Sequence, residues 1–330
     1  MAQKHDEFMN SRFYLVLQPR MLVHTNTDHL PMFRKAVLTI GTFDGVHLGH
    51  QQIIRQLKSE AIANGGETVI VTFHPHPRKI VKDKPDGISL LNTLPEKIKL
   101  LESHGIDHLV VVPFTPEFST LTAEQYVTDF LVRKFRPAIL IIGYDHRFGQ
   151  GRSGNYELLE EMGPGGGFEV KEIPEHILNT VTVSSTRIRQ DLKEGKLAEA
   201  NQFLGYPYGL SGTVVEGDRR GRTIGFPTAN LRLEDEEKLI PADGVYAVTV
   251  SIGDRENVYR GMMNIGFRPT VGGTRRSIEI HIINFSEDIY GSVLHLKLHH
   301  YVRREKKFSS LEELKAQLIA DQGEVVRLLT

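Results

Sequence analysis

The stretch Gly41-Thr42-Phe43-Asp44-Gly45-Val46-His47-Leu48-Gly49-His50 lies between two segments of different periodicity. Residues 36–40 before it form an apolar run typical of a buried strand, and apolar residues recur after it at a helical spacing over 53–61. The pattern predicts a strand, a glycine turn and a helix, whose first N–H groups and dipole favour an anion over the turn. Because His47 and His50 meet there beside a glycine, we interpret the turn as a nucleotide phosphate site.

The composition is that of an ordinary globular protein. A chain of 330 residues predicts two domains, and its hydrophobic fraction is 40%. A net charge of -1 and a pI near 7.0 argue against generic nucleic-acid binding, which favours a strongly basic surface. The chain has no cysteine, so disulfides and thiolate metal sites are excluded.

The sequence shows neither a targeting segment nor a membrane segment. No apolar run approaches the ~18 residues of a membrane span, and residues 1–7 lack the basic start and apolar core of a signal peptide. We therefore expect a cytoplasmic protein that acts on small molecules, with no nucleic-acid partner and no membrane partner. The sequence leaves open whether it forms a homo-oligomer.

Strands and helices alternate over residues 36–205, which we expect to be the first domain. Strands are expected at 36–40, 68–73, 108–113, 138–142 and 168–173, and helices beginning near 50, 95, 122, 184 and 197. This alternation is typical of a parallel, Rossmann-like α/β sheet that binds ligands at the carboxyl ends of its strands. Residues 1–35 show no clear period and are expected to form an N-terminal extension.

Three further motifs follow these strands. They are Phe73-His74-Pro75-His76-Pro77, the loop from Gly143 to Gly149, and Ser184-Ser185-Thr186-Arg187-Ile188-Arg189 at a helix start. With the histidine turn, they resemble the His-x-Gly-His nucleotidyltransferases. More narrowly, residues 37–192 resemble the FMN adenylyltransferase (FAD synthetase) module of prokaryotic bifunctional riboflavin biosynthesis proteins. The chain departs from that family at His146, where an aromatic residue is usual, and at Asn155, which is often acidic.

The resemblance implies adenylyl transfer from ATP to FMN, giving FAD and pyrophosphate. Since the attacking phosphate is already anionic, catalysis requires charge neutralisation and in-line positioning, with Mg²⁺ bridging the phosphates. We assign His47 and His50 to the transferring phosphate. ATP or phosphate contacts are implied for Gly41, Phe43, Asp44, Gly45, His74, Ser184, Ser185, Thr186 and Arg189, and a weaker flavin contact for Asp145.

Other interpretations of these motifs are less favoured. Two histidines in His74-Pro75-His76 invite a metal ion, but no cysteine or recognisable carboxylate accompanies them. The glycines of 149–154 fit a dinucleotide-binding pattern, yet they begin several residues after the expected strand, so a glycine-rich loop is favoured. Pro164 to Gly167 is also expected to be a loop. No phosphate loop of the common NTPase type occurs.

The second domain is expected to span residues 206–330. Short strands without intervening helices are predicted at 212–215, 244–252, 258–264, 277–285 and 292–298. They favour an antiparallel β-barrel, followed by a closing helix that begins near Phe308.

Five segments of this half resemble riboflavin kinase, over about residues 210–327. They are Gly221 to Asn230, Pro241 to Tyr246, Asn264 to Thr270 with Ile278 to His281, and Arg303 to Phe308. The chain departs from that family at Asn284, where aspartate is usual. The resemblance implies phosphorylation of riboflavin to FMN by ATP.

The residue types of this half suit that reaction. Thr228 and Asn230 offer hard oxygen ligands for Mg²⁺, and Glu279 lies on the strand face opposite its isoleucine neighbours, where a general base belongs. By itself such a glutamate is more often a solvated surface residue. Gly221 and Gly225 would let the backbone wrap the ATP phosphates, and Arg268 and Arg303 are assigned weakly to the flavin.

Taken together, the two halves predict a bifunctional enzyme of flavin cofactor synthesis. One alternative is a protein with a single active module, the kinase before the adenylyltransferase. A second is a regulator that binds flavin without converting it.

Overall fold

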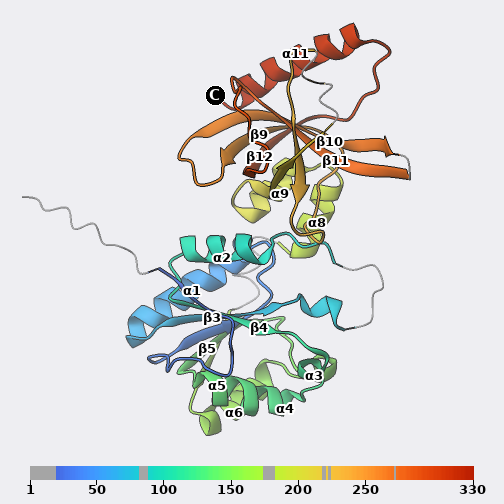
Figure 1. Cartoon of the computed structure of the whole chain (residues 1–330). Coiled ribbons are helices and arrows are strands. Elements are labelled where there is room, and N and C mark those ends of the chain that lie inside the picture. The colour runs from blue at the N-terminus through green and yellow to red at the C-terminus, as the bar shows by residue number, and fades with distance from the viewer. Residues whose placement is uncertain (1–19, 82–87, 174–182, 218–220, 222–223, 271–272) are drawn as a thin grey trace, which may run out of the picture.

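The computed structural model describes residues 20–81, 88–173, 183–217, 221, 224–270 and 273–330, together with the side chains of all but 268–275 among them. It consists of a sheet module and a barrel module, with two short helices between them (Figure 1). The predicted fold class, an α/β sheet followed by an antiparallel barrel and a C-terminal helix, is confirmed.

The sheet of the first module is entirely parallel. Its strands are β1 (Leu22–His24), β2 (Val37–Ile40), β3 (Thr68–His74), β4 (His108–Pro113), β5 (Ile139–Gly143) and β6 (Glu169–Ile173). They lie in the order β1-β4-β3-β2-β5-β6. β3 and β4 therefore extend the sheet on one side of β2, and β5 and β6 extend it on the other side. The histidine turn follows β2 at this switch point, where open α/β sheets bind their ligands.

Helices cover both faces of this sheet. α1 (Leu48–Asn64) and α2 (Leu94–Ser103) pack on one face through residues such as Ile54, Leu57 and Leu101. The other face is covered by the continuous helical segment α4 (Ala123–Gln125), η2 (Tyr126–Val132) and α5 (Arg133–Phe135), and by α6 (Tyr156–Gly166). The short helices η1 (Pro77–Lys79), α3 (Pro116–Ser119) and η3 (Gln150–Arg152) lie in the connections.

One of the two loops expected in this module differs in the structure. α6 runs to Gly166, so the loop predicted from Pro164 is wrong for its first three residues. A Cβ on Gly166 would lie 2.6 Å from the ring of Phe168, so glycine here allows the helix to pack closely on that ring. The glycines of 149–154 form a tight turn closed by a bridge between Phe148 and Gly154.

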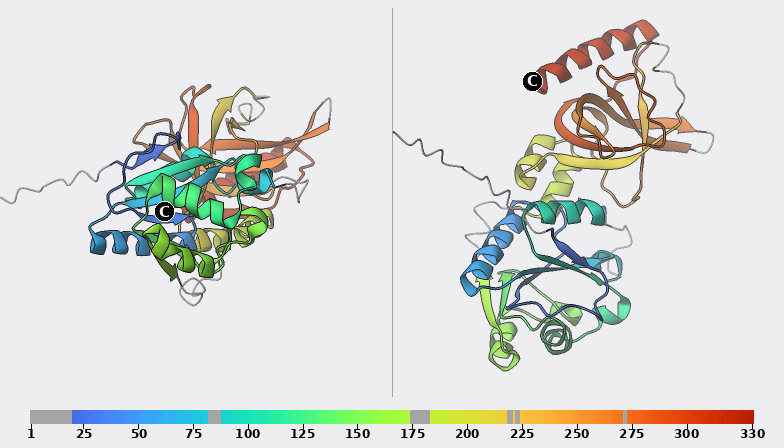
Figure 2. Two further views of the ribbon diagram at one scale, coloured as in Figure 1. Left: turned by 90° about the horizontal axis from the view of Figure 1, so that it is seen from below. Right: turned by 60° about the vertical axis from the view of Figure 1, so that its left-hand side comes forward.

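α8 (Ser185–Lys193) and α9 (Leu197–Leu204) lie between the modules, as Figures 1 and 2 both show. Their apolar side chains, among them Ile188, Leu192 and Leu204, belong to the same buried cluster as the barrel residues Tyr208 and Leu298. The helix pair is therefore packed as part of the barrel.

The barrel is closed and antiparallel. Its strands are β7 (Tyr208–Val215), β8 (Ala229–Leu233), β9 (Gly244–Ile252), β10 (Val258–Thr270), β11 (Gly273–Ile282) and β12 (Val293–Arg303), in the order β10-β11-β8-β7-β12-β9. α11 (Leu311–Leu328) then packs on the outside through Val325. The sequence analysis did not predict β1 or β8, which have only three and five residues.

Candidate active sites of the two modules

The histidine turn has a constrained backbone. Phe43, Gly45 and Val46 have φ angles of 46°, 88° and 36°, which is the left-handed region. This region is unfavourable for a β-branched residue such as Val46, so the turn depends on surrounding contacts to hold its shape. Phe43 and Val46 are fully buried in the module core, which provides those contacts.

Side chains from several elements bind the carbonyl groups of the turn. The carbonyl of Thr42 accepts from Lys97 Nζ at 2.6 Å and from Thr72 Oγ1 at 3.1 Å. Ser185 Oγ donates to the carbonyl of Asp44 at 2.8 Å.

Two further carbonyls of the turn are bound from the module boundary. Tyr206 donates to Gly45, and Gln51 Nε2 donates to Val46 at 3.0 Å and to Leu204 at 2.9 Å. At the first turn of α1, the N–H groups of Leu48 and Gly49 have no hydrogen-bond partner in the part of the chain that the structure describes. The turn thus presents unpaired N–H groups at the positive end of a helix 17 residues long, which is an anion-binding arrangement.

His47 and His50 lie together at this helix start. Their rings stack with centroids 3.7 Å apart, and His47 Nδ1 accepts from the N–H of His50 at 3.4 Å. Burial lowers the pKa of His47 to about 4, although Asp44 opposes the shift. Burial, and then the charges of His47 and Lys97, hold the pKa of His50 well below its usual value. Both imidazoles are therefore neutral at pH 7 and donate through an N–H rather than as cations.

Asp44 and Arg189 form a buried ion pair, with Arg189 Nη2 2.5 Å from Asp44 Oδ2. Asp44 also accepts from the N–H groups of Leu91 and Asn92 at 3.0 and 3.1 Å, and Arg189 Nε donates to the carbonyl of Ser89 at 2.8 Å. The pair fixes the segment before α2 against the turn. Its net charge is zero.

The other predicted phosphate contacts lie around the same turn. Ser184 caps α8 by accepting from the N–H of Arg187, and Thr186 is exposed beside it. His74 is exposed at the carboxyl end of β3, and burial followed by Lys97 and Lys79 lowers its pKa. A Cβ on Gly41 would lie 3.2 Å from the Phe43 ring.

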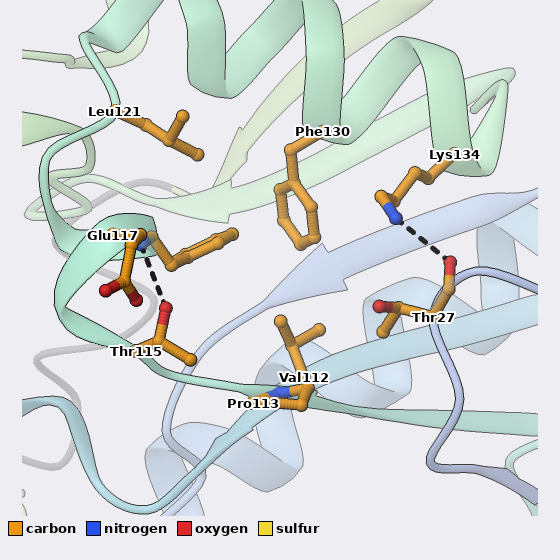
Figure 3. A pocket seen from close by; sticks show the side chains of 9 residues that line it. Thr27, Val112, Pro113, Thr115, Glu117, Leu121, Phe130 and Lys134 are labelled. Carbon is orange, nitrogen blue, oxygen red and sulfur yellow. Dashed lines mark hydrogen bonds between the residues drawn. The ribbon is translucent and has the colours of Figure 1, made fainter.

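A cavity of about 330 Å³ opens at the carboxyl end of β4 (Figure 3). Phe118 and Phe130 line it, and Lys134 lies at its rim, donating to the carbonyl of Thr27 at 3.1 Å. Phe118 also contacts Phe73 at the end of β3, with ring centroids 5.6 Å apart. None of the predicted site residues lines this cavity.

The loop after β5 carries Asp145, the predicted flavin contact, and His146, the first departure from the family. Asp145 is exposed. His146 lies 5.9 Å from the Phe148 ring, and burial lowers its pKa to about 4. Asn155, the second departure from the family, caps α6 by accepting from the N–H of Leu158 at 3.1 Å.

The sheet module and the barrel module are joined by two ion pairs, in which only Lys238 is fully buried. Lys238 Nζ, from the segment before β9, donates to Glu96 Oε2 at 2.6 Å and to the carbonyl of Leu91 at 2.7 Å. Lys79 and Glu237 form a second ion pair across the boundary. The segment that contacts Asp44 therefore also contacts the barrel module.

In the barrel, a glycine turn precedes β8. Gly221 accepts from the N–H of Phe226 at 2.8 Å, and a Cβ on Gly221 would lie 2.2 Å from the Phe226 carbonyl. Gly225 has a φ of 85°, so both positions require glycine.

Thr228, Asn230 and Glu279 are brought together by neighbouring strands. Asn230 pairs with Glu279 in the β8–β11 ladder, and Thr228 Oγ1 lies 3.5 Å from Glu279 Oε2. Ser277 Oγ lies 3.4 Å from Glu279 Oε1. His281, two residues along the same strand face, bonds through Nδ1 to the carbonyl of Pro227 at 2.9 Å and so holds the segment.

The remaining barrel candidates have no described contact with Thr228, Asn230 or Glu279. Arg303 forms a two-pronged ion pair with the buried carboxylate of Asp321, which ties β12 to α11. Arg268 lies on β10 opposite Arg275, and its side chain is outside the described residues. Asn284 has a φ of 56°, a conformation that asparagine tolerates better than most residues.

Comparison with known proteins assigns a family to each module. The FAD synthetase family model matches residues 30–187, and the riboflavin kinase family model matches residues 204–329. The bifunctional riboflavin kinase/FMN adenylyltransferase of Escherichia coli K12 is 40% identical over 287 residues, covering 87% of this chain and 90% of that protein. The chain belongs to the bifunctional riboflavin kinase/FMN adenylyltransferase family. The member from Bacillus subtilis is 34% identical, covering 89% and 92% of the two chains.

A solved structure supports the two-module architecture of this chain. A Streptococcus pneumoniae crystal structure, named as a macrolide-efflux protein, matches with a TM-score of 0.82 and 32% identity. The match covers 92% of this chain and 97% of that one. Within the described residues, no helix combines the length and the apolar character needed to cross a bilayer.

Two residues of the candidate sites were missed from the sequence. Lys97 occupies a buried position of α2, four residues before Leu101, and a lysine on an apolar stripe was the available signal. His281 shares a strand face with Glu279, and that alternation was visible in the sequence.

Proposed function

We propose that the turn after β2 binds the α-phosphate of ATP and directs the attack of FMN on it. The observation that carries this assignment is the stacked pair His47 and His50 at the start of α1, where the unpaired N–H groups also lie. Neutral imidazole N–H groups and backbone N–H groups neutralise charge that builds up on the transferring phosphate. No general base is needed, since the FMN phosphate is anionic at pH 7. Ser184, Ser185, Thr186 and Arg189 are proposed to position the triphosphate tail.

We propose that the isoalloxazine ring of FMN packs on the aromatic cluster at the ends of β3 and β4. Phe73, Phe114 and Phe118 contact one another there, beside the cavity of Figure 3. With strands about 4.8 Å apart, the end of β4 lies about 10 Å from the end of β2. A ribityl phosphate bridges a gap of this size. Asp145 is proposed to contribute a polar contact from the neighbouring loop.

In the barrel we propose that Glu279 accepts the proton of the riboflavin 5′-hydroxyl as it attacks the γ-phosphate of ATP. Thr228 supplies a hydroxyl oxygen and Asn230 an amide oxygen within the same group, and this hard-oxygen set fits Mg²⁺. A bound Mg²⁺ would neutralise charge on the phosphates. The glycine turn at Gly221 and Gly225 is proposed to wrap the phosphate chain.

We propose Arg303 and Arg268 as weaker flavin contacts in the barrel. Arg303 is engaged by Asp321, so a flavin contact would have to use the rest of its guanidinium. Arg268 is retained as a flavin contact on the resemblance alone. Because both reactions consume ATP, we propose the cytoplasm as the compartment.

One incubation tests the overall reaction sequence. The protein is given riboflavin, ATP and Mg²⁺, and the flavins are resolved by chromatography. FMN and FAD formed in succession support the proposal. FMN alone supports a single active module, and unchanged riboflavin supports a binding protein without turnover.

A further inference from the structure

Lys97 is a buried ammonium group that the assigned roles leave unused. Its residue is only 6% exposed, and it lies on α2 beneath the histidine turn. Nζ donates to the carbonyl of Thr42 at 2.6 Å and lies 3.4 Å from Thr72 Oγ1. Removing an isolated charge from water costs several kcal/mol unless something compensates it. A partner that compensates the buried charge of Lys97 is therefore expected.

The carboxylates near Lys97 are engaged by other groups. Asp44 binds Arg189, and Glu96 binds Lys238. Within the described part of the chain, no carboxylate oxygen lies within ion-pair distance of Lys97 Nζ. The charges of Asp44, Arg189 and Lys97 sum to +1, so the groups that hold the histidine turn carry one excess positive charge.

The histidines around this excess charge are neutral at pH 7. The titratable and charged groups that interact with Asp44 include His47, Tyr206, Lys238 and Arg189. Three histidines also interact with Lys97, namely His50 on α1, His74 at the end of β3 and His76 before η1. The pKa values of the three histidines are lowered, mainly by burial and in part by the charge of Lys97. The histidines therefore cannot balance or replace the charge on Lys97.

We propose that Lys97 is a positioning residue of FMN adenylylation. Its ammonium fixes the carbonyl of Thr42, and with it the turn, and provides the uncompensated positive charge that the transferring phosphate meets. Lys97 exchanges no proton and forms no bond in the reaction, in which the FMN phosphate oxygen bonds to the α-phosphorus and pyrophosphate leaves. The inference rests on the proposed assignment of the turn to that phosphate.

The expected size of the effect follows from comparable groups. Removing one fixed electrostatic contact to a reacting centre typically lowers kcat by about 10²–10³. Burial lowers the pKa of Lys97 to about 8, while Asp44 opposes the shift. In the enzyme without substrate, the charge is then lost as the pH rises above 8, and phosphate binding stabilises the charged form.

The test compares Lys97→Met, Lys97→Arg and the matched control Lys99→Met, which removes an exposed lysine from the same helix. FAD formation from FMN and FMN formation from riboflavin are measured separately in the full chain. We expect Lys97→Met to lower kcat/KM for FAD formation about 100-fold and to leave riboflavin phosphorylation unchanged. Lys99→Met should change neither reaction.

The pH profile separates a charge role from mere packing. Wild-type kcat/KM for FAD formation should fall above pH 8, and Lys97→Arg should stay active through pH 9 because its guanidinium does not deprotonate. An unchanged fall near pH 8 in Lys97→Arg would overturn the inference. If Lys97→Met also loses kinase activity, its fold is disturbed. The pH profile of Lys97→Arg then tests the inference instead.

A failure of the inference is distinguishable from a failure of the proposed phosphate site. If Lys97→Met remains within threefold of wild type while His47→Ala/His50→Ala abolishes FAD formation, Lys97 has no such role and the site assignment stands. If the double histidine variant still makes FAD, the site assignment itself fails.

Discussion

The histidine turn of the sheet module and the Gly221–Asn230 segment of the barrel are both proposed phosphate sites, but they hold charge differently. In the sheet module, Asp44, Arg189 and Lys97 are buried. In the barrel, Glu279 and Thr228 are half-buried, and their oxygens lie 3.5 Å apart.

The chemistry of the two nucleophiles explains this difference. An FMN phosphate attacks as an anion, so the first site can be built from fixed charges that never change protonation. A riboflavin hydroxyl must lose a proton, so the second site needs a carboxylate whose environment permits exchange. A buried charge network suits the first reaction and would hinder the second.

The double variant His47→Ala/His50→Ala is expected to have the largest effect on activity, and it tests whether the two sites are independent. Removing both imidazole donors should lower FAD formation by about 10⁴-fold while riboflavin phosphorylation continues, so FMN accumulates. Chromatography of the flavins checks both products. Loss of FMN formation as well would show that the two sites are not independent.

Glu279→Gln should give the reverse pattern with a slightly smaller effect. An amide of the same shape cannot take the hydroxyl proton, so we expect about a 10³-fold loss of riboflavin phosphorylation. Supplied FMN should still be converted to FAD at the wild-type rate. A variant that phosphorylates riboflavin normally would refute Glu279 as the base.

Lys238→Met tests whether the boundary between the modules supports the sheet site. It removes a buried ammonium group and leaves the half-buried Glu96 without its ion-pair partner, for which a loss of about 2 kcal/mol in the free energy of unfolding is expected. FAD formation should fall by about tenfold at a fixed temperature below unfolding, because the Leu91 segment also holds Asp44. Chemical denaturation and the two activity assays measure these effects.

The control for this variant is Arg255→Met, which removes an exposed ion pair with Glu287. Surface pairs of this kind contribute little, so no measurable change is expected. Equal losses from Lys238→Met and Arg255→Met would show that burial at the boundary has no special role.

A further difference between the modules is expected in the pH dependence of stability. Burial lowers the pKa of His47, His76 and His146 to about 4. Between pH 6.5 and 4 the unfolded chain binds protons that the folded chain does not, so the free energy of unfolding falls as the pH is lowered. The half-buried His295 and His299 of the barrel should contribute less.

Hydrogen exchange at pH 7 and pH 5, corrected for the intrinsic exchange rate, would show where this stability is lost. Amide protection in β2, β3 and β5 should decrease more than protection in β9 and β10. A uniform decrease across both modules would contradict the assignment of the acid sensitivity to the buried histidines of the sheet module.

Local patterns in the sequence were enough to predict most of the fold. The run before Gly41 and the helical spacing after His50 are set by neighbouring residues, and β2 and α1 form there. Short strands with weak patterns, such as β8, gain their hydrogen bonds from β7 and β11 and were not predicted. The end of α6 was predicted to be a loop because its glycines are favoured by the packing of Phe168, a contact that the pattern does not contain.

The candidate sites were predictable to a similar degree. Residue types and motif spacing identified His47, His50 and Glu279 as candidates. The ion pair of Asp44 with Arg189 joins residues 145 positions apart, and Lys97 contacts Thr42 across 55 positions. No local signal encodes such partners. The sequence could propose which residues meet a phosphate, but not which buried charges neutralise one another.

The position of α8 has a consequence for dividing the chain into working parts. One helix carries Arg189 toward Asp44 of the sheet module and Ile188 and Leu192 into the barrel core. If the chain is cut before α8, the sheet fragment loses Arg189. If it is cut after α8, the barrel fragment loses Ile188 and Leu192 from its core. Only fragments that each keep their own copy of residues 183–205 would retain both sets of contacts, so the shared helix makes clean fission of the two enzymes difficult.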